Sequence, residues 1–135
     1  MKPILKIKRV YDEPAKSDGY RILVDRLWPR GLSKEQATVH AWIKSLAPST
    51  PLRRWFRHDP VLWPEFLKRY RSELKRNKSV SEFFENYGHL KRITLLYAAL
   101  DKDHTHALIL KEFLEHANEN SIEEYESIYS PHSSN

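Results

Sequence analysis

The stretch YRILVDRLWPRG, Tyr20–Gly31, decides the fold. Its apolar centre, Ile22–Val24, is continuous rather than alternating, which predicts a strand buried on both faces, as in a parallel sheet. We expect this strand to span Tyr20–Leu27. A second continuous run, RITLLYAAL over residues 92–100, predicts another buried strand, and the alternating run over residues 5–11 predicts a third.

Helical patterns separate these predicted strands. Ser33–Gln36 has the S-x-x-Q form of a capping box, which predicts a helix reaching about Leu46 with Trp42 facing inward. Apolar residues recur at helical spacing between Trp63 and Leu74, which predicts a major helix. That helix is expected from Pro60 or Pro64 to Asn77, and further helices are expected over residues 79–87 and 103–117.

The order strand, strand, helices, strand, helix predicts an α/β domain. Its core is expected to be a small open, mainly parallel sheet of three or more strands flanked by helices. A chain of 135 residues can bury one such core. We expect residues 1–118 to form a single α/β domain and residues 119–135 to form an acidic, loosely ordered C-terminal tail.

Composition excludes several classes of site. The chain has no cysteine, so disulfides, zinc–thiolate sites and cysteine nucleophiles are ruled out. The N-terminus lacks the apolar core of a signal peptide, and no apolar run approaches a membrane span. These features predict a cytoplasmic protein that does not contact a membrane.

Charge is distributed unevenly along the chain. Residues 1–78 carry 19 Lys and Arg against 8 Asp and Glu, or +11, whereas residues 79–135 carry 4 against 10, or −6; the two parts give the net +5. A basic half attracts anions, from a phosphate group to a nucleic acid backbone. Solvated helix faces and an acidic tail explain the same asymmetry without a ligand.

Charged residues follow the predicted strands, and open parallel sheets bind ligands at the carboxyl ends of their strands. We predict Asp25 and Asp101 as catalytic acid–base residues at this edge. Arg26 and Arg30 are predicted to bind the phosphate or carboxylate of a ligand. The alternative for both arginines is an ion-pair network that fastens the loop to the sheet.

Four further residues are predicted to bind ligand. Trp28 could stack on a planar ligand, although a role as a plug of the core is favoured. Ser49 is predicted as an anion ligand or a helix cap. Arg53 and His58 follow a proline-rich bend that could direct them back at the strand ends.

The segment Asp101–His106, DKDHTH, is the best candidate for acid–base or metal chemistry outside that loop. On a helix, however, His104 and His106 would point in nearly opposite directions. A capped helix start is therefore favoured over a metal site, and we predict no metal. The identity of any cofactor stays open.

Several motifs together resemble a known family. They are VYDEP at 10–14, residues 18–31, APSTPLRRWFRHDP at 47–60, W-x-x-F-x-x-R-Y at 63–70, and LLYAALDKDHTHALILKEFL at 95–114. In combination they strongly resemble the YeaO-like branch of a bacterial and archaeal domain-of-unknown-function family over residues 4–116. The family has no established activity. Its pattern has Lys where Leu100 stands and Asn where Thr105 stands.

Two functions of different class follow. The first is a protein or enzyme that binds a small anion or a nucleotide-like ligand in a polar pocket at the carboxyl ends of the strands. The second is a nucleic-acid-binding module that uses the basic face of residues 53–78. Whether the chain is an enzyme, which reaction it would catalyse and its oligomeric state stay open.

Overall fold

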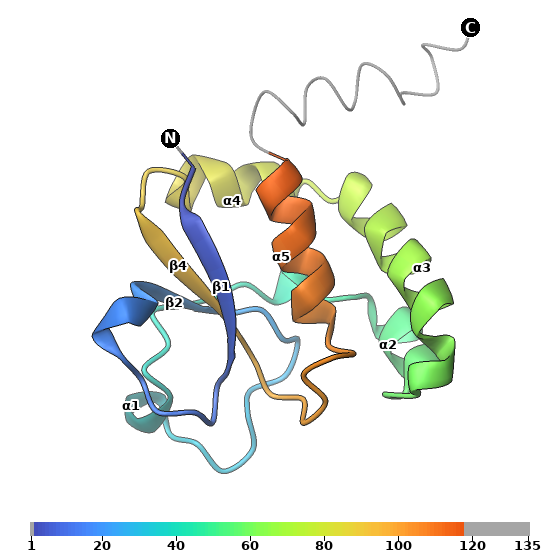
Figure 1. Ribbon diagram of the computed structural model, residues 1–135, viewed down its shortest axis with the longest axis horizontal. Helices are drawn as coiled ribbons and strands as arrows, with labels where there is room; N and C mark the ends of the chain where they lie inside the picture. The colour runs from blue at the N-terminus through green and yellow to red at the C-terminus, as the bar shows by residue number, and fades with distance from the viewer. Residues whose placement is uncertain (1, 118–135) are drawn as a thin grey trace, which may run out of the picture.

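The structure, a computed structural model, describes residues 2–117 (Figure 1). The strands are β1 (Ile4–Arg9), β2 (Tyr20–Leu23), β3 (Ala41–Trp42) and β4 (Arg92–Tyr97). The helices are α1 (Lys34–Ala37), α2 (Thr50–Phe56), α3 (Trp63–Lys75), α4 (Ser79–Tyr87) and α5 (His106–His116). Short 3₁₀ turns are η1 (Lys16–Asp18), η2 (Lys44–Leu46) and η3 (Pro60–Leu62). Among these residues, no helix combines the length and hydrophobicity that crossing a membrane requires.

The four strands form one parallel sheet in the order β1-β4-β2-β3. The strand β4, last along the chain, pairs with β1 on one side and with β2 on the other. Crossovers between parallel strands need long connections, and helices supply most of them here. The predicted small open parallel sheet flanked by helices is therefore confirmed.

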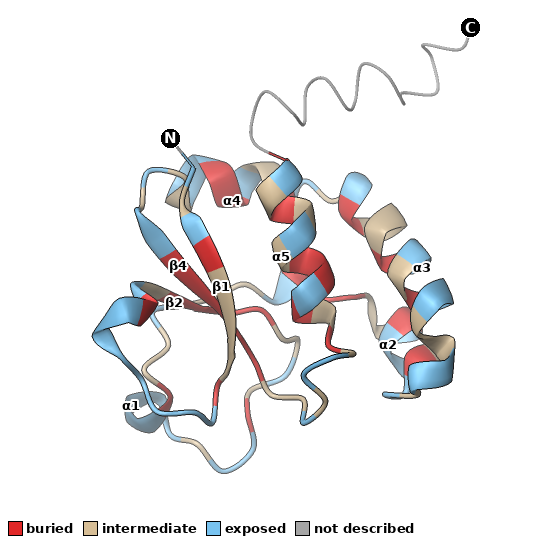
Figure 2. Cartoon of the chain, in the orientation of Figure 1, coloured by how far each residue is buried: buried red, intermediate tan, exposed pale blue. Residues whose placement is uncertain are grey.

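The two faces of the sheet bury separate sets of apolar side chains, and buried residues lie along the strands and on the helices beside them (Figure 2). One face packs against α2 to α5, and its core includes Leu5, Ile93, Leu95 and Ile22. The other face carries a smaller apolar cluster, in which Leu23 of β2 packs with Ala37 of α1 and with Trp28 and Leu32 of the loop between β2 and α1. Alternation along each strand separates the two sets, because successive side chains point to opposite faces.

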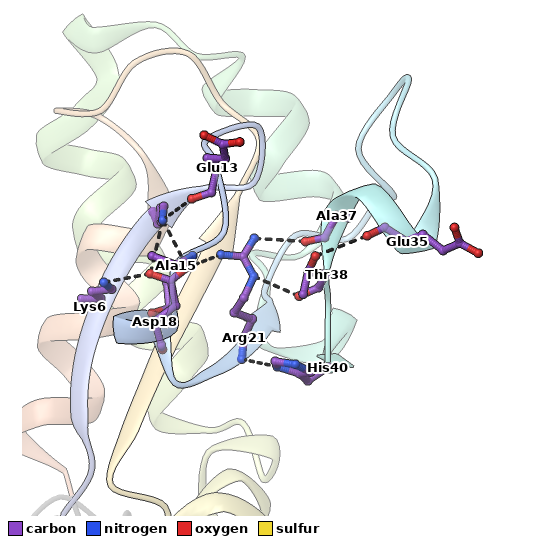
Figure 3. A network of polar contacts seen from close by, with 11 residues as sticks. Lys6, Glu13, Ala15, Asp18, Arg21, Glu35, Ala37, Thr38 and His40 are labelled. Carbon is purple, nitrogen blue, oxygen red and sulfur yellow. Dashed lines mark hydrogen bonds and ion pairs between the residues drawn. The ribbon is translucent and has the colours of Figure 1, made fainter.

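A polar network covers the amino-terminal half of this second face (Figure 3). Lys6, Thr94 and Arg21 lie in register on three neighbouring strands. The Asp18 carboxylate, fully buried, lies over them and contacts Lys6 at 2.9 Å, Lys8 at 3.1 Å and Arg21 at 2.5 Å. Thr94 Oγ1 donates to the Asp18 carbonyl oxygen at 2.7 Å. The network ties η1 to three strands.

Arg21 extends this network toward α1. Its Nε donates to the Thr38 carbonyl at 2.9 Å and its second terminal nitrogen donates to the Ala37 carbonyl at 3.0 Å. Ala37 is the last residue of α1, and Thr38 is its left-handed C-cap, with φ 49°. A buried guanidinium is stable only when its donors find acceptors, and here carbonyls and Asp18 supply them. Arg21 therefore positions α1.

The helix predicted from Ser33 to Leu46 is wrong beyond its first turn. The capping box itself is confirmed, because Ser33 and Gln36 exchange both hydrogen bonds at 3.0 and 3.1 Å. The left-handed Thr38 then ends α1. The following residues form β3, where Trp42 pairs with Leu23 of β2. The predicted strands and helices elsewhere are present but mostly shorter, and α2 was not predicted.

We expect Asp18→Asn to lower the free energy of unfolding by about 3–5 kcal/mol at pH 7, because it leaves buried Arg21 without its counter-charge. Burial opposes ionisation, but hydrogen bonds from Lys6, the Ala15 N–H, Lys8 and Arg21 hold the pKa of Asp18 well below its usual range. The stabilisation is therefore complete above the unfolded-state pKa, about 3.9, and is lost as the pH falls below it. Urea unfolding at pH 7 and pH 3 measures both effects.

The exposed Glu35 provides a matched control for this substitution. Glu35→Gln removes one carboxylate from α1 while leaving the buried network intact. A loss equal to that of Asp18→Asn would contradict the assigned role of the network.

Candidate functional site

The carboxyl end of β2 holds Asp25 beside the end of β4. Val24 donates its N–H to the Leu96 carbonyl at 3.1 Å, so pairing continues one residue beyond β2. Asp25 Oδ2 then accepts the Ala98 N–H at 2.9 Å. From β3, the strand on the other side of β2, Trp42 Nε1 donates to the Asp25 carbonyl oxygen at 2.7 Å. Asp25 therefore has a fixed position at the edge where open parallel sheets bind ligands.

His106, from α5, lies against the same strand end. Thr105 caps α5, so His106 is its first residue. His106 Nε2 lies 3.0 Å from the Val24 carbonyl oxygen and 3.4 Å from Asp25 Oδ1. A carbonyl oxygen only accepts, so Nε2 carries a proton. In the neutral ring, Nδ1 is then the unprotonated nitrogen and can accept a hydrogen bond.

Burial shifts both members of this pair. The Asp25 side chain is 17% exposed and that of His106 is 15% exposed. Burial raises the pKa of Asp25, although His106, the Ala98 N–H, His58 and Arg53 oppose the rise. Burial also lowers the pKa of His106, although Asp25 opposes the fall. His106 is therefore neutral at pH 7, and the two pKa values move toward each other, as is common at functional sites.

Arg53 and His58 bring further charge to Asp25. Both side chains are exposed, and both act electrostatically on the Asp25 carboxylate. Arg53 comes from α2, and the chain then turns through two successive left-handed residues, Arg57 at φ 49° and His58 at φ 57°. Such conformations are strained for residues other than glycine and concentrate at functional sites. The direction of Arg53 and His58 toward the strand ends stays a prediction.

Arg26 and Trp28 have structural contacts. The Arg26 guanidinium donates to the carbonyls of Ala47 and Pro48 at 3.2–3.3 Å, which fastens the loop to the segment before α2. Trp28 Nε1 donates to the Leu32 carbonyl at 2.7 Å, and its ring packs edge-on against Trp42. These contacts favour a role for Arg26 in fastening the loop and a role for Trp28 as a plug of the core, rather than direct ligand binding by either residue.

Ser49 caps α2. Its Oγ accepts the Leu52 N–H at 3.2 Å and donates to Glu73 Oε2 at 2.5 Å. Its own N–H donates to Glu73 Oε1 at 2.9 Å. The hydroxyl is thus engaged on both sides, which favours the helix-cap alternative. Arg30 is exposed, and its carbonyl oxygen accepts a hydrogen bond from the Tyr11 hydroxyl at 2.7 Å.

Asp101 makes local contacts instead of joining Asp25. Its Oδ1 accepts the N–H groups of Asp103 and His104, and its Oδ2 lies 2.8 Å from His104 Nδ1. The hydrogen bond with His104 lowers the pKa of Asp101. No described contact links Asp101 to Asp25. Within residues 2–117, no three His, Asp or Glu side chains gather as a metal site would require.

Sequence reasoning missed the part played by Tyr70. This residue belongs to the apolar stripe of α3, yet its hydroxyl donates to the Leu46 carbonyl at 2.5 Å and its ring lies 5.9 Å from that of His106. Burial, together with Glu73 and Asp25, raises the pKa of Tyr70. Helical spacing indicates that Tyr70 faces inward, but nothing in the sequence indicates which strand end it meets.

We expect Asp25→Asn to be more stable than the parent chain at pH 7 but not at pH 4. An aspartate whose folded-state pKa is raised disfavours the fold once the pH exceeds its unfolded value, by about 1.4 kcal/mol for each unit of the shift. The asparagine keeps an acceptor for the Ala98 N–H without the buried charge. Melting temperatures at both pH values measure the difference, with the exposed Asp12→Asn as control. A pH-independent difference would contradict this account.

Known proteins similar to this chain place it in a family. The model of an inactive DUF488-N3 subclade matches residues 4–132. The uncharacterized protein YeaO of Escherichia coli (strain K12) is 40% identical over 110 residues, or 82% of this chain and 96% of that protein. An uncharacterized protein of Mycobacterium tuberculosis (strain H37Rv) is 36% identical over 110 residues, or 82% and 92%. No solved structure matches the chain. The chain therefore belongs to the YeaO-like DUF488 family, in the subclade described as inactive.

Proposed function

We propose that the chain binds a small anionic ligand, nucleotide-like in class, at the carboxyl ends of β2 and β4. The observation that carries this proposal is the Asp25–His106 pair at the end of β2, on whose carboxylate the exposed Arg53 and His58 also act electrostatically. Arg53 and His58 supply exposed positive or hydrogen-bonding groups, which suit a phosphate or carboxylate. Asp25 lies beside His106, whose unprotonated Nδ1 can accept a hydrogen bond from the ligand.

Binding without turnover is the role we favour for this site. The family description as inactive supports it, as does the separation of the two predicted catalytic carboxylates into different contacts. Asp25 then acts as a fixed acceptor rather than as a general base. Asp101 shapes the turn before α5 and lies outside the proposed ligand contacts.

A thermal-shift titration tests this site. We expect inorganic phosphate or a nucleoside monophosphate to raise the melting temperature at low salt, because a ligand of the native state stabilises it by about 2.7 kcal/mol at a hundred times its Kd. Arg53→Gln should abolish most of this rise. His58→Asn should reduce it while keeping a side chain that tolerates left-handed backbone.

Arg54→Gln is the matched control. Arg54 is the next residue on α2 and is equally exposed and charged, but it does not perturb Asp25. Equal losses in the Arg53 and Arg54 variants would indicate general charge attraction rather than a site. The absence of a shift with every anion tested would refute the proposal.

Nucleic acid binding is the second candidate, favoured by the composition of the α2–α3 surface. Exposed cations here include Arg54 on α2, Lys68 on α3 and Arg76 at the C-cap of α3. The Arg69 guanidinium lies 4.2 Å from the centre of the Trp55 ring. Such surfaces combine phosphate contacts with stacking. Two neighbouring arginines instead form ion pairs, Arg69 with Glu65 and Arg71 with Glu112, which limits the charge available.

Salt dependence distinguishes this candidate from the strand-end site. If the α2–α3 surface binds nucleic acid, fluorescence anisotropy with a single-stranded oligonucleotide should show affinity that falls steeply with salt. Lys68→Gln should then weaken oligonucleotide binding and leave the phosphate-induced thermal shift unchanged. Oligonucleotide affinity that is absent or insensitive to salt would exclude this candidate.

A further inference from the structure

Two large apolar residues stand out by their exposure. Val61 in η3 and Leu100 in the segment after β4 are each 83% exposed, more than any other large hydrophobic residue within residues 2–117. The predicted tail over residues 119–135 lies outside these described residues. Single exposed apolar residues are ordinary on protein surfaces, whereas apolar residues that gather at one place indicate an interaction. The position of these two residues relative to each other therefore matters.

A contact between two rings brings their segments together. Trp63, two residues after Val61, packs its ring edge-on against that of His104, with 5.4 Å between the ring centres. His104 is held in turn by Asp101, whose Oδ2 lies 2.8 Å from His104 Nδ1. Asp101 directly follows Leu100 in the sequence. The two exposed apolar residues therefore belong to neighbouring segments, although they lie far apart along the chain.

Aromatic contacts also connect these segments to the proposed anion site. The Phe56 ring centre lies 6.3 Å from that of His58 and 5.9 Å from that of Trp63. His58 acts electrostatically on the Asp25 carboxylate and is one of the residues proposed to bind the anion. A row of rings, His58, Phe56, Trp63 and His104, therefore runs from the anion site to the segment that holds Leu100.

Burial and charge give this row a direction. Phe56 is buried, whereas Trp63 and His104 are half-buried and present part of their rings to solvent. Partly exposed rings can pack against a planar group of a ligand. The Asp101 carboxylate beside His104 repels an anion. The charged part of a ligand therefore belongs at the His58 end of the row, and an uncharged ring belongs at the other end.

We propose that Val61, Trp63, Leu100 and His104 form a subsite for an aromatic ring carried by the anionic ligand. The ligand is then a phosphate monoester that bears an aromatic ring, the class to which nucleoside monophosphates belong. This inference rests on the proposed anion site beside Asp25 and adds the residues that determine its specificity. Ligand sites of this kind combine apolar and aromatic surface with a few charged groups.

A comparison of two anions tests the subsite. Phenyl phosphate and inorganic phosphate are each titrated into the full chain at constant ionic strength, and the melting temperature is followed. We expect phenyl phosphate to bind about tenfold more tightly, because its ring leaves water on binding. In the double variant Val61→Ser/Leu100→Ser, this preference should fall toward unity while the affinity for inorganic phosphate stays unchanged.

Ile4→Ser is the matched control. Ile4 is also largely exposed, at 70%, but it begins β1 and so lies at the opposite end of the parallel sheet. Figure 1 shows the chain leaving β1 and β4 at the end of the sheet away from the N-terminus. The Ile4→Ser variant should keep the full preference for phenyl phosphate.

The tryptophan side chains provide a second, direct measurement. In ¹H–¹⁵N spectra, phenyl phosphate should shift the indole N–H signal of Trp63, which is assigned with the variant Trp63→Phe. The signal of Trp28, whose indole N–H donates to the Leu32 carbonyl, should not move. Inorganic phosphate should shift the Trp63 signal less than phenyl phosphate does.

The outcomes separate this inference from the anion site on which it rests. Equal affinities for phenyl phosphate and inorganic phosphate would overturn the subsite and leave the anion site standing. A preference that survives in the Val61→Ser/Leu100→Ser variant, or that Ile4→Ser also abolishes, would overturn the subsite too. If neither anion binds, both the anion site and the subsite are refuted.

Discussion

The buried ion pair between Asp18 and Arg21 is the interaction on which the arrangement of this domain depends. A carboxylate with no solvent exposure needs its charge balanced, and cations from β1 and β2 converge on it. The same guanidinium binds the end of α1, and the Asp18 carbonyl accepts from Thr94 of β4. One short turn therefore fixes the spacing of three strands and the position of a helix. A purely apolar interface would fix these positions less specifically, since hydrophobic contact is not directional.

The two ends of the sheet carry different kinds of polar group. Its amino-terminal half contains satisfied charges that hold the loops in place. At its carboxyl end, Asp25 and His106 form a pair, and the side chains of Arg53 and His58 are exposed. The strained backbone at Arg57 and His58 lies on this side. Rigid charges at one end and exposed charges at the other are what a binding edge on a stable scaffold requires.

The sequence predicts β1 from its alternating residues, and β2 and β4 from their continuous apolar runs. The strand β3 has two residues, so no pattern reveals it, and Trp42 suits an inward position in a helix as well as in a strand. Asp18 looks like a turn residue in the sequence, because nothing there shows that β4 lies between β1 and β2 and thereby places their cations around it. Asp25 was found from its place after a strand. His106 was considered only with His104, because its contact with Val24 depends on how α5 packs.

The position of β1 at the edge of the sheet has a consequence for solubility. An edge strand exposes backbone hydrogen-bonding groups that can recruit strands from other molecules, and exposed apolar residues such as Ile4 increase that risk. The strand reads ILKIKR, and lysine is a residue that natural edge strands use to prevent such pairing. Here Lys6 and Lys8 also balance Asp18, so the charges that stabilise the fold also keep its open edge from aggregating.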